Sequence, residues 1–414
     1  MSILIKNIKS LAGIDDGKRS MVRGKDMSKF DSIENAFLLI EGDSIVSYGA
    51  MSSLKNNLSQ VDTEIDASGK FVLPSFCDSH THLVYASSRE SEFADRINGL
   101  TYQQIFERGG GILNSSGKLR AASETELFET AWNRLNEIMM QGTGAVEIKS
   151  GYGLDTAGEL KMLRVIRKLK EKHPLTIKAT FLGAHAIPSE YKNDKEGYIR
   201  LLTDEMMPLV ASEKLADYCD VFCEQGYFTY DDTKKLLEAG LKHGMKPKVH
   251  AEQLSHSGGI RAGVECNAIS VDHLEFCNDE DISALKVSGT MPTLLPGAQY
   301  FLQLQHPPAR KMIDGGLAVA VASDYNPGSC PSGNMMQMIS LCCIQYKMTP
   351  EEAFNAATLN SAYAMDLSET HGSIAIGKNA SLIITKAIPS LAYLPYSFGS
   401  NLIDTIIING KLIS

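Results

Sequence analysis

The stretch FCDSHTHLVYASSRE, residues 76–90, places two histidines directly after an apolar run. His80 and His82 are separated by one threonine, and Phe71-Val72-Leu73 precedes them. Side chains at i and i+2 point to the same face of a strand, so both imidazoles lie on one side. Two neutral imidazoles suit Zn²⁺ or an iron ion, with histidine and carboxylate completing the ligand set. The stretch therefore predicts a metal site at the end of a buried strand, with the cation of Arg89 close behind it.

The middle of the chain alternates strand and helix patterns. Eight segments are expected strands, at residues 71–77, 144–148, 177–182, 219–223, 246–249, 268–271, 291–295 and 318–322. Amphipathic segments of helix length lie between most of them, most clearly at 126–140, 157–172 and 232–243. Eight strands are the number that a (β/α)₈ TIM-like barrel needs, so we expect an α/β fold of this kind.

A doubly wound open sheet is the alternative fold. It usually carries a Gly-rich nucleotide loop after an early strand. The sequence contains neither GxGxxG nor the P-loop pattern. Gly109-Gly110-Gly111 lacks the rest of either motif and is expected to be a mobile turn.

Both ends of the chain predict short strands instead of strand–helix units. Residues 36–40 and 44–49 flank the turn Glu41-Gly42-Asp43, which is typical of a hairpin. Residues 381–384 and 405–408 are rich in β-branched side chains. We therefore expect residues 1–66 and 372–414 to pair into one small β-sandwich domain, with the barrel occupying residues 67–371.

Composition excludes several classes of protein. The 414 residues are 43% hydrophobic and 21% charged, with a net charge of −9 and no basic run that would indicate a nucleic-acid surface. The eight cysteines form no CxxC pair, which favours a reduced cytoplasmic location over a disulfide scaffold. The N-terminal segment lacks the apolar core of a signal peptide, and no run is long enough to span a bilayer. Apolar edges of the β domain are compatible with a homodimer.

Barrel enzymes carry their chemistry at the C-terminal ends of the strands. Those positions hold five of the ten histidines of this chain, at His80, His82, His185, His250 and His273. A lone histidine is more often a satisfied core or surface residue, but five at matching positions weaken that explanation. His250 and Asp324 follow strands whose inward faces reach the barrel axis, so they are the expected third and fourth ligands, with a water at the open position. The fourth strand has no lysine for the carbamate bridge of binuclear relatives, so we expect one metal.

Several segments resemble the amidohydrolase superfamily and, within it, the imidazolonepropionases. HTH at 80–82 is shared by many hydrolases, whereas KSGYGL at 149–154, LGAHA at 182–186 and DYNPGS at 324–329 are specific. The matching segments span most of the chain; Ser75 and Cys77 depart from the glycine and valine of the pattern without touching the ligands. The resemblance implies hydrolysis of 4-imidazolone-5-propanoate, a small anionic substrate, to N-formimidoyl-L-glutamate. It also implies one Zn²⁺ or Fe³⁺ per subunit on His80, His82, His250 and Asp324.

The same resemblance implies substrate contacts from Arg89, Tyr152, His185, Gln253, Asn326, Gly328 and Ser329. The chemistry agrees with these residue types. Asp324 is suited to take the proton of a water and pass it to the departing ring nitrogen. His273 is suited to hydrogen-bond the attacking water or the developing oxyanion. Arg89 is suited to bind the propanoate with two parallel hydrogen bonds.

Other readings of these residues remain open. Arg89 could pair with Glu90 or Glu92, and Tyr152 could anchor a loop between its two glycines. Gly328 and Ser329 could offer backbone N–H groups to a carboxylate or form an ordinary turn. Three more residues have undecided roles: Glu252 as the support of a neighbour, Tyr102 in the pocket or in packing, and Glu224 in a buried polar contact with Cys223.

Two other functions share the metal set. A second mononuclear amidohydrolase, such as a deaminase of a heterocycle, would need the metal ligands but not Arg89. A non-catalytic barrel used as an interaction scaffold would tolerate loss of the ligands, and all four are present here. The sequence does not choose between zinc and iron, because histidine and carboxylate serve both.

Overall fold

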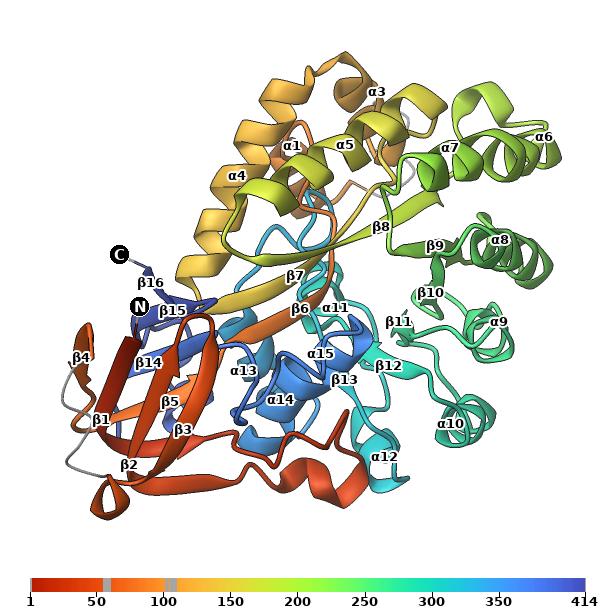
Figure 1. The fold of residues 1–414 in the computed structure, drawn as a ribbon. Coiled ribbons are helices and arrows are strands. Elements are labelled where there is room, and N and C mark those ends of the chain that lie inside the picture. The colour runs from red at the N-terminus through yellow and green to blue at the C-terminus, as the bar shows by residue number, and fades with distance from the viewer. Residues whose placement is uncertain (1, 55–60, 101–103, 105–109, 414) are drawn as a thin grey trace.

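The computed structural model describes residues 2–54, 61–100, 104 and 110–413. It contains a parallel barrel of eight strands and a mixed sheet that both ends of the chain build together (Figure 1). Tyr102 and Gly109, which the sequence singled out, lie outside the described residues.

The barrel confirms the expected fold class. Its strands pair in chain order, and every neighbouring pair is parallel. They are β6 (Phe76–Thr81), β7 (Thr143–Lys149), β8 (Thr176–Ala184), β9 (Tyr218–Cys223), β10 (Lys246–Ala251), β11 (Ser270–His273), β12 (Met291–Leu294) and β13 (Ala320–Val321). All eight lie where the sequence predicted strands, except that the first differs in its extent.

The apolar run at 71–77 is divided between two sheets, so the prediction of one barrel strand there was wrong. Its first part, β5 (Lys70–Pro74), pairs with strands of the mixed sheet. Its last residues begin β6, and the backbone N–H groups of Ser75 and Phe76 turn to the carbonyls of Ser381 and Gly142, both at 2.9 Å. The run is continuous because both sheets bury it, and an apolar run alone does not reveal a change of sheet.

The helices lie on the outside of the barrel (Figure 1). The three that the sequence predicted are confirmed as α4 (Glu124–Met140), α5 (Thr156–Lys172) and α8 (Tyr230–Lys242). Each begins at a side-chain cap, from Ser123, Asp155 and Thr229 respectively. The others are α1 (Glu90–Ile97), α3 (Ile112–Ala121), α6 (Lys195–Arg200), α7 (Met207–Ser212), α9 (Gly259–Glu265), α10 (Asp279–Lys286), α11 (Pro296–Leu302), α12 (Ala309–Asp314), α13 (Met335–Gln345), α14 (Pro350–Asn355), α15 (Ser361–Ala364) and α16 (Tyr393–Tyr396). No helix in the described part of the chain is long and apolar enough to cross a membrane.

Short helices of other types interrupt the chain. Three are 3₁₀ helices, at Gly24–Ser28, Met51–Ser53 and Ser189–Tyr191. Two are π-helical, at Leu201–Met206 and Ala356–Asn360, and both continue an α-helix.

The residues after β13 close the barrel against β6. The N–H of Asp324 donates to the carbonyl of His80 at 3.0 Å, and the N–H of His82 donates to the carbonyl of Tyr325 at 2.9 Å. These two bonds bring the last strand beside the first, so segments more than 240 residues apart in sequence meet at one edge. The carboxylate expected as a metal ligand thereby comes next to the HTH segment.

The small β domain is one mixed sheet with the order β16-β15-β14-β5-β1-β2-β3, and β4 also pairs with β1. Its strands are β1 (Ser2–Ala12), β2 (Ser32–Glu41), β3 (Ser44–Ala50), β4 (Thr63–Asp66), β14 (Leu382–Ala387), β15 (Ile403–Ile408) and β16 (Lys411–Ile413). Buried side chains from both ends, including Ile5, Leu38 and Ile384, form its own core. The pairing of the two ends is confirmed, and the N- and C-terminal labels lie close together on this sheet in Figure 1.

The division into residues 1–66, 67–371 and 372–414 stays a prediction. β5 lies past the first of these boundaries and still belongs to the small sheet.

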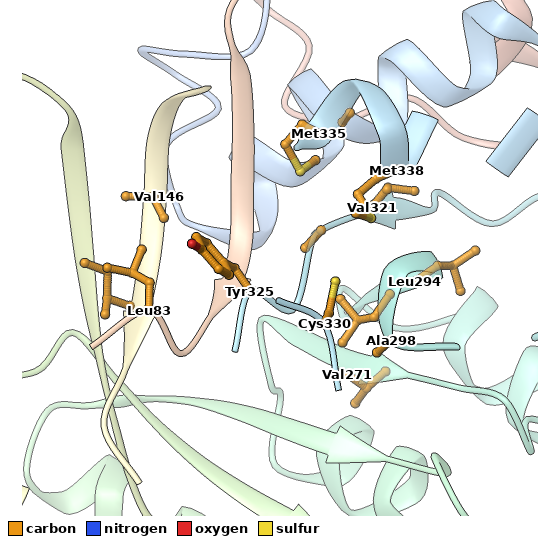
Figure 2. Close-up of a cluster of buried hydrophobic side chains, with 14 of the residues drawn as sticks. Leu83, Val146, Val271, Leu294, Ala298, Val321, Tyr325, Cys330, Met335 and Met338 are labelled. Atoms are coloured by element: carbon orange, nitrogen blue, oxygen red, sulfur yellow. The ribbon is translucent and has the colours of Figure 1, made fainter. Parts of the chain in front are cut away.

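The outward faces of the barrel strands pack against the surrounding helices. Val271 of β11, Leu294 of β12 and Val321 of β13 are buried together with Met335 and Met338 of α13 (Figure 2). Burial of such side chains stabilises the fold by roughly 1.5–3 kcal/mol each. This apolar layer holds the strand ends that carry the polar residues described next.

Candidate metal centre and active-site cavity

Three histidines converge at the C-terminal end of the barrel. The Nε2 atom of His82 lies 3.3 Å from Nε2 of His80 and 3.3 Å from Nε2 of His250. All three side chains are buried, and each offers a ligand atom within 4.8 Å of the others. His80 lies on β6, His82 directly follows that strand, and His250 lies on β10, as the sequence predicted.

Buried carboxylates orient two of these imidazoles. Nδ1 of His80 lies 2.7 Å from Oδ2 of Asp272, and Nδ1 of His250 lies 3.1 Å from Oδ1 of Asp220. A carboxylate accepts from Nδ1–H, which leaves the Nε2 lone pair for the centre of the cluster. Burial, and next the charge of Lys149, hold the pKa of His80 well below its usual range. Nε2 lone pairs that face one another across 3.3 Å repel, so this donor set fits a metal ion.

Asp324 completes the cluster from the other side. Its Oδ1 atom lies 3.6 Å from Nε2 of His80 and 3.5 Å from Nε2 of His82. The residue has a φ of 57°, an uncommon conformation for a non-glycine residue, three positions after the end of the short strand β13. Burial raises the pKa of Asp324 to about 7. Three imidazoles and one carboxylate therefore face a common point.

A buried layer of charge lies beneath the cluster. The Nζ atom of Lys149 lies 2.6 Å from Glu147, 2.8 Å from Asp220 and 3.8 Å from Asp272. Lys248 pairs with Glu147 as well and donates to the carbonyl of Ser79 at 3.0 Å. Burial acts to lower the pKa of Lys149, and the surrounding carboxylates outweigh it and raise that pKa. Burial opposes the charge of Asp220, but His250 and Lys149 outweigh it and hold the pKa of Asp220 well below its usual range, whereas burial raises the pKa of Asp272.

One cavity of about 560 Å³ opens onto this cluster. It gathers nearly all the residues that the sequence singled out: His82, Arg89, Tyr152, His185, His250, Gln253, His273, Asp324, Asn326, Gly328 and Ser329. His80 does not line the cavity, but its Nε2 atom lies 3.3 Å from that of His82, which does. The volume suits a small ligand.

Arg89 also lines the cavity. Its Nη2 atom is 2.5 Å from Oε2 of Glu92, so the salt bridge considered from the sequence is formed. The other oxygen of Glu92 accepts from the N–H of Gly111 at 3.0 Å. The guanidinium also lies against Gly328: a Cβ there would sit 2.3 Å from Nη1 of Arg89. The ion pair with Glu92 does not exclude substrate binding, because both residues line the cavity.

A glutamate holds the loop that carries Tyr152. Oε1 of Glu159 accepts from the N–H groups of Gly153 and Leu154, and Oε2 accepts from that of Gly151. Gly151 has a φ of 107°, so this turn needs a glycine. Burial raises the pKa of the Tyr152 phenol well above its ordinary value, so it is a neutral donor. The loop is thus rigid, and Tyr152 lines the cavity as well.

His185 joins the polar side of the cavity. Its Nδ1 atom lies 3.0 Å from the carbonyl of Gly151, and its ring stacks on that of His82 with centroids 5.0 Å apart. Burial lowers the pKa of His185 to about 3, so the ring is neutral. Gln253 lines the same cavity after β10.

The loop at 324–329 is organised by Asn326. Its Oδ1 atom accepts from the N–H groups of Gly328 at 2.7 Å and Ser329 at 2.8 Å. The hydroxyl of Ser329 donates to Oδ2 of Asp324 at 3.1 Å. The two backbone donors considered for a carboxylate are therefore occupied within the loop. Gly328 contributes room for Arg89, and Ser329 orients the carboxylate of Asp324.

Glu252 and Glu224 support loops. Glu252 accepts from the N–H groups of Gly258 and Ile260, both at 2.8 Å, where α9 begins. Glu224 accepts from the N–H of Leu254 at 2.8 Å, whereas the thiol of Cys223 points to the carbonyl of Ser257 at 4.0 Å. The polar contact expected between Cys223 and Glu224 side chains is not among those the described residues form.

The sequence did not single out every residue of the site. The cavity residues that it did not name are Arg96, Ile112, Phe222, Tyr227, Leu254, Leu302 and Leu304. Glu92 was considered only as a partner of Arg89, and it also lines the cavity. Arg96 lies seven positions after Arg89, a spacing that places two residues on one helical face. The charge layer was also missed, although Glu147 and Lys149 alternate in the way that inward-facing strand residues do.

The chain is similar over its full length to known proteins of one family. A model of the amidohydrolase family matches residues 71–413. The imidazolonepropionase of Christiangramia forsetii is 56% identical over 413 residues and covers 100% of both chains, and that of Flavobacterium johnsoniae has the same identity and coverage. The imidazolonepropionase of Alkaliphilus metalliredigens is 41% identical and covers 100% of this chain and 98% of its own.

Solved structures share the fold at low identity. A triazine hydrolase variant matches with a TM-score of 0.76 and 16% identity, covering 99% of this chain and 94% of its own. An adenosine deaminase from Xanthomonas campestris with bound zinc matches with a TM-score of 0.72 and 13% identity, covering 99% and 92%. The barrel excludes the alternative of a doubly wound sheet. The full-length similarity to curated relatives shows the family. The chain belongs to the amidohydrolase family and, within it, to the imidazolonepropionases.

Proposed function

We propose that the chain hydrolyses 4-imidazolone-5-propanoate to N-formimidoyl-L-glutamate, the ring-opening step of histidine degradation. The observation that carries this proposal is the shared cavity: the cluster of His82, His250 and Asp324 and the guanidinium of Arg89 line the same space. A cyclic amide with an anionic arm needs both features. Full-length relatives named imidazolonepropionase support the same substrate.

We propose one metal ion per chain, held by His80, His82, His250 and Asp324. The convergence of buried nitrogen and oxygen donors supports this set. The related adenosine deaminase has bound zinc, which favours Zn²⁺, and Fe³⁺ remains the alternative. When bound, such an ion supplies an activated water near neutral pH and polarises the carbonyl of the substrate.

Asp324 is the proposed proton carrier. Its carboxylate takes a proton from the attacking water and delivers it to the ring nitrogen whose bond to the carbonyl carbon breaks. The hydroxyl of Ser329 holds Oδ2, which leaves Oδ1 toward the cluster.

Arg89 is the proposed partner of the propanoate, with the Tyr152 hydroxyl beside it. The pair with Glu92 fixes the direction of the guanidinium in advance, which lowers the entropy lost on binding. His185, Gln253 and Asn326 are proposed to contact the polar ring. His273 is proposed to hydrogen-bond the attacking water.

Two further expectations belong to this proposal. A cytoplasmic location and a homodimer remain predictions from the sequence. Neither is needed for the reaction, because every proposed ligand and substrate contact comes from one chain.

The position of a labelled oxygen tests the reaction. Metal-loaded protein is incubated with enzymatically generated substrate in ¹⁸O-labelled water, and the product is analysed by mass spectrometry. Cleavage of the ring amide places one ¹⁸O in the α-carboxylate of formimidoylglutamate. Attack at the amidine carbon, which would give an N-formyl amide with the ¹⁸O in its formyl group, or release of ammonia from a neutral heterocycle with no action on the imidazolone, would favour a different amidohydrolase.

A further inference from the structure

Two buried polar groups at the end of β11 face each other without a hydrogen bond. Neither Nδ1 of His273 nor either carboxyl oxygen of Glu275 has a hydrogen-bond partner among the described residues. The two side chains are 2% and 1% exposed, and Nδ1 lies 4.0 Å from Oε1. Buried polar atoms are nearly always hydrogen-bonded, and an unsatisfied carboxyl group costs stability. Such a group needs a reason other than packing.

The backbone that carries this pair is strained. His273 has a φ of 90° and Leu274 a φ of 74°, two consecutive non-glycine residues in a region that such residues rarely adopt. Neighbouring segments hold the turn: the N–H of Leu274 donates to Ala251 at 3.1 Å, and Nε2 of Gln305 donates to the carbonyl of Glu275 at 2.6 Å. Strain of this kind persists where surrounding contacts enforce it, often at functional sites.

His273 links the pair to the reaction. It lines the cavity, and its ring lies 5.5 Å from that of His80 and 5.3 Å from that of His250, measured between centroids. Its Nδ1 atom faces away from the cavity toward Glu275, so Nε2 is the nitrogen left for a ligand. Which ring nitrogen carries the proton therefore decides what His273 offers to a bound water.

We propose that Glu275 is the positioning residue of His273. Its carboxyl group accepts a hydrogen bond from Nδ1–H, which turns the lone pair of Nε2 toward the attacking water. The bond forms when metal binding brings Nδ1 of His273 and Oε1 of Glu275 about 1 Å closer, to ordinary hydrogen-bond distance. The inference rests on the proposed function in so far as His273 contacts that water.

Matched substitutions separate positioning from packing. Glu275→Leu removes the carboxyl group and fills the same space with apolar atoms, so the thermal midpoint stays the same or rises. The kcat of metal-loaded Glu275→Leu falls about 10–100-fold, the range seen when supporting partners are lost, with KM and metal content unchanged. Glu275→Gln keeps an acceptor oxygen and retains a kcat above that of the leucine variant. A leucine variant that loses stability but keeps its kcat would overturn the proposal.

A double-mutant cycle tests whether Glu275 acts through His273. In the background of His273→Asn, adding Glu275→Leu should lower kcat no further, because the residue that it positions is gone. Multiplying losses would mean an independent role and contradict the proposal.

A measurement without substrate keeps this test apart from the proposed reaction. NMR spectra of zinc-loaded protein with ¹⁵N-labelled histidine report the ring nitrogens. The signals of His273 are assigned as those that are missing from the spectrum of His273→Asn. The expected spectrum shows Nδ1 protonated in the wild type, with that tautomer lost in Glu275→Leu. An Nε2–H tautomer in the wild type would overturn the pairing even if the imidazolone is opened, and the Nδ1–H tautomer would support it even if it is not.

Discussion

The ammonium group of Lys149 lies 2.8 Å from Oδ2 of Asp220, whose Oδ1 lies 3.1 Å from Nδ1 of His250. One buried carboxylate thus connects a cation to a proposed metal ligand. Asp272 is placed in the same way: its Oδ2 atom lies 3.8 Å from Nζ of Lys149 and 2.7 Å from Nδ1 of His80. Partners of ligating histidines fix ring orientation and raise metal affinity.

Lys149→Met should weaken the metal site. The substitution leaves Asp220 and Asp272 buried without their cation, so their hold on the two imidazoles loosens. We expect zinc affinity, measured by competition with a chelator, to fall about 10–100-fold. Lys248→Met is the comparison variant, because Lys248 bonds Glu147 and backbone carbonyls but neither aspartate, and its charge acts on Asp272 only through space, so a smaller loss is expected. Equal affinity losses in the two folded variants would contradict this account.

Arg89→Ala should impair binding of the anionic arm while the metal is retained. A hydrogen-bonded ion pair is worth about 1.5–3 kcal/mol, so kcat/KM should fall roughly 10–100-fold, mostly through KM. Arg89→Lys should recover little, because an ammonium group cannot form two parallel bonds. Steady-state kinetics with metal analysis provide the measurement. An unchanged KM would remove Arg89 from the substrate site.

Gly328→Ala should mimic the loss of Arg89. The added Cβ would sit 2.3 Å from Nη1 of Arg89, and the flexible guanidinium can move away at little cost to stability. We expect a raised KM and an unchanged thermal midpoint. Gly117→Ala in α3 is the control, since a Cβ there meets nothing within 4 Å. If the KM of Gly328→Ala equals that of the wild type, the guanidinium does not act from its observed place.

Buried His173 should make the protein sensitive to acid. Burial lowers the pKa of His173 to about 4, below the 6.5 of an exposed histidine. The unfolded chain therefore takes up the proton at a higher pH than the folded protein does. The stability that the neutral ring contributes is lost as pH falls from about 6.5 to about 4. In the neutral ring, Nδ1 accepts from the N–H of Leu175 at 3.3 Å, and Nε2–H donates to Asn136 at 3.2 Å.

Denaturant unfolding at several pH values measures this effect. The free energy of unfolding should lose up to about 3 kcal/mol from this group across that range. His173→Gln, which cannot titrate, should show a shallower slope. Parallel pH profiles for the two proteins would show that His173 does not carry the effect.

The sequence predicted the barrel and the histidine cluster at its strand ends because both depend on local patterns. Strand spacing gives the barrel, and the i, i+2 spacing of His80 and His82 gives a shared face. The run at 71–77 was misread because burial in two different sheets leaves the same apolar pattern. The ion pair of Arg89 with Glu92 could be stated only as an alternative, since a helical spacing permits a contact without requiring it.

Long-range contacts explain what the sequence could not supply. Asp220 and Lys149 lie on different strands and 71 positions apart, so their contact depends on strand register. The orphaned state of Glu275 depends on everything packed around it. Neither is encoded in a short motif, which is why the charge layer and the pair at the end of β11 emerged only from the structure.

The central claim is that a metal held by the histidine cluster opens the imidazolone ring. The most direct test mixes metal-loaded protein with freshly generated 4-imidazolone-5-propanoate and follows the fall of its ultraviolet absorbance. The account predicts decay far above the spontaneous rate, with one metal per chain, and loss of both metal and activity in His80→Ala. Spontaneous decay alone in protein that carries a full equivalent of metal would contradict it.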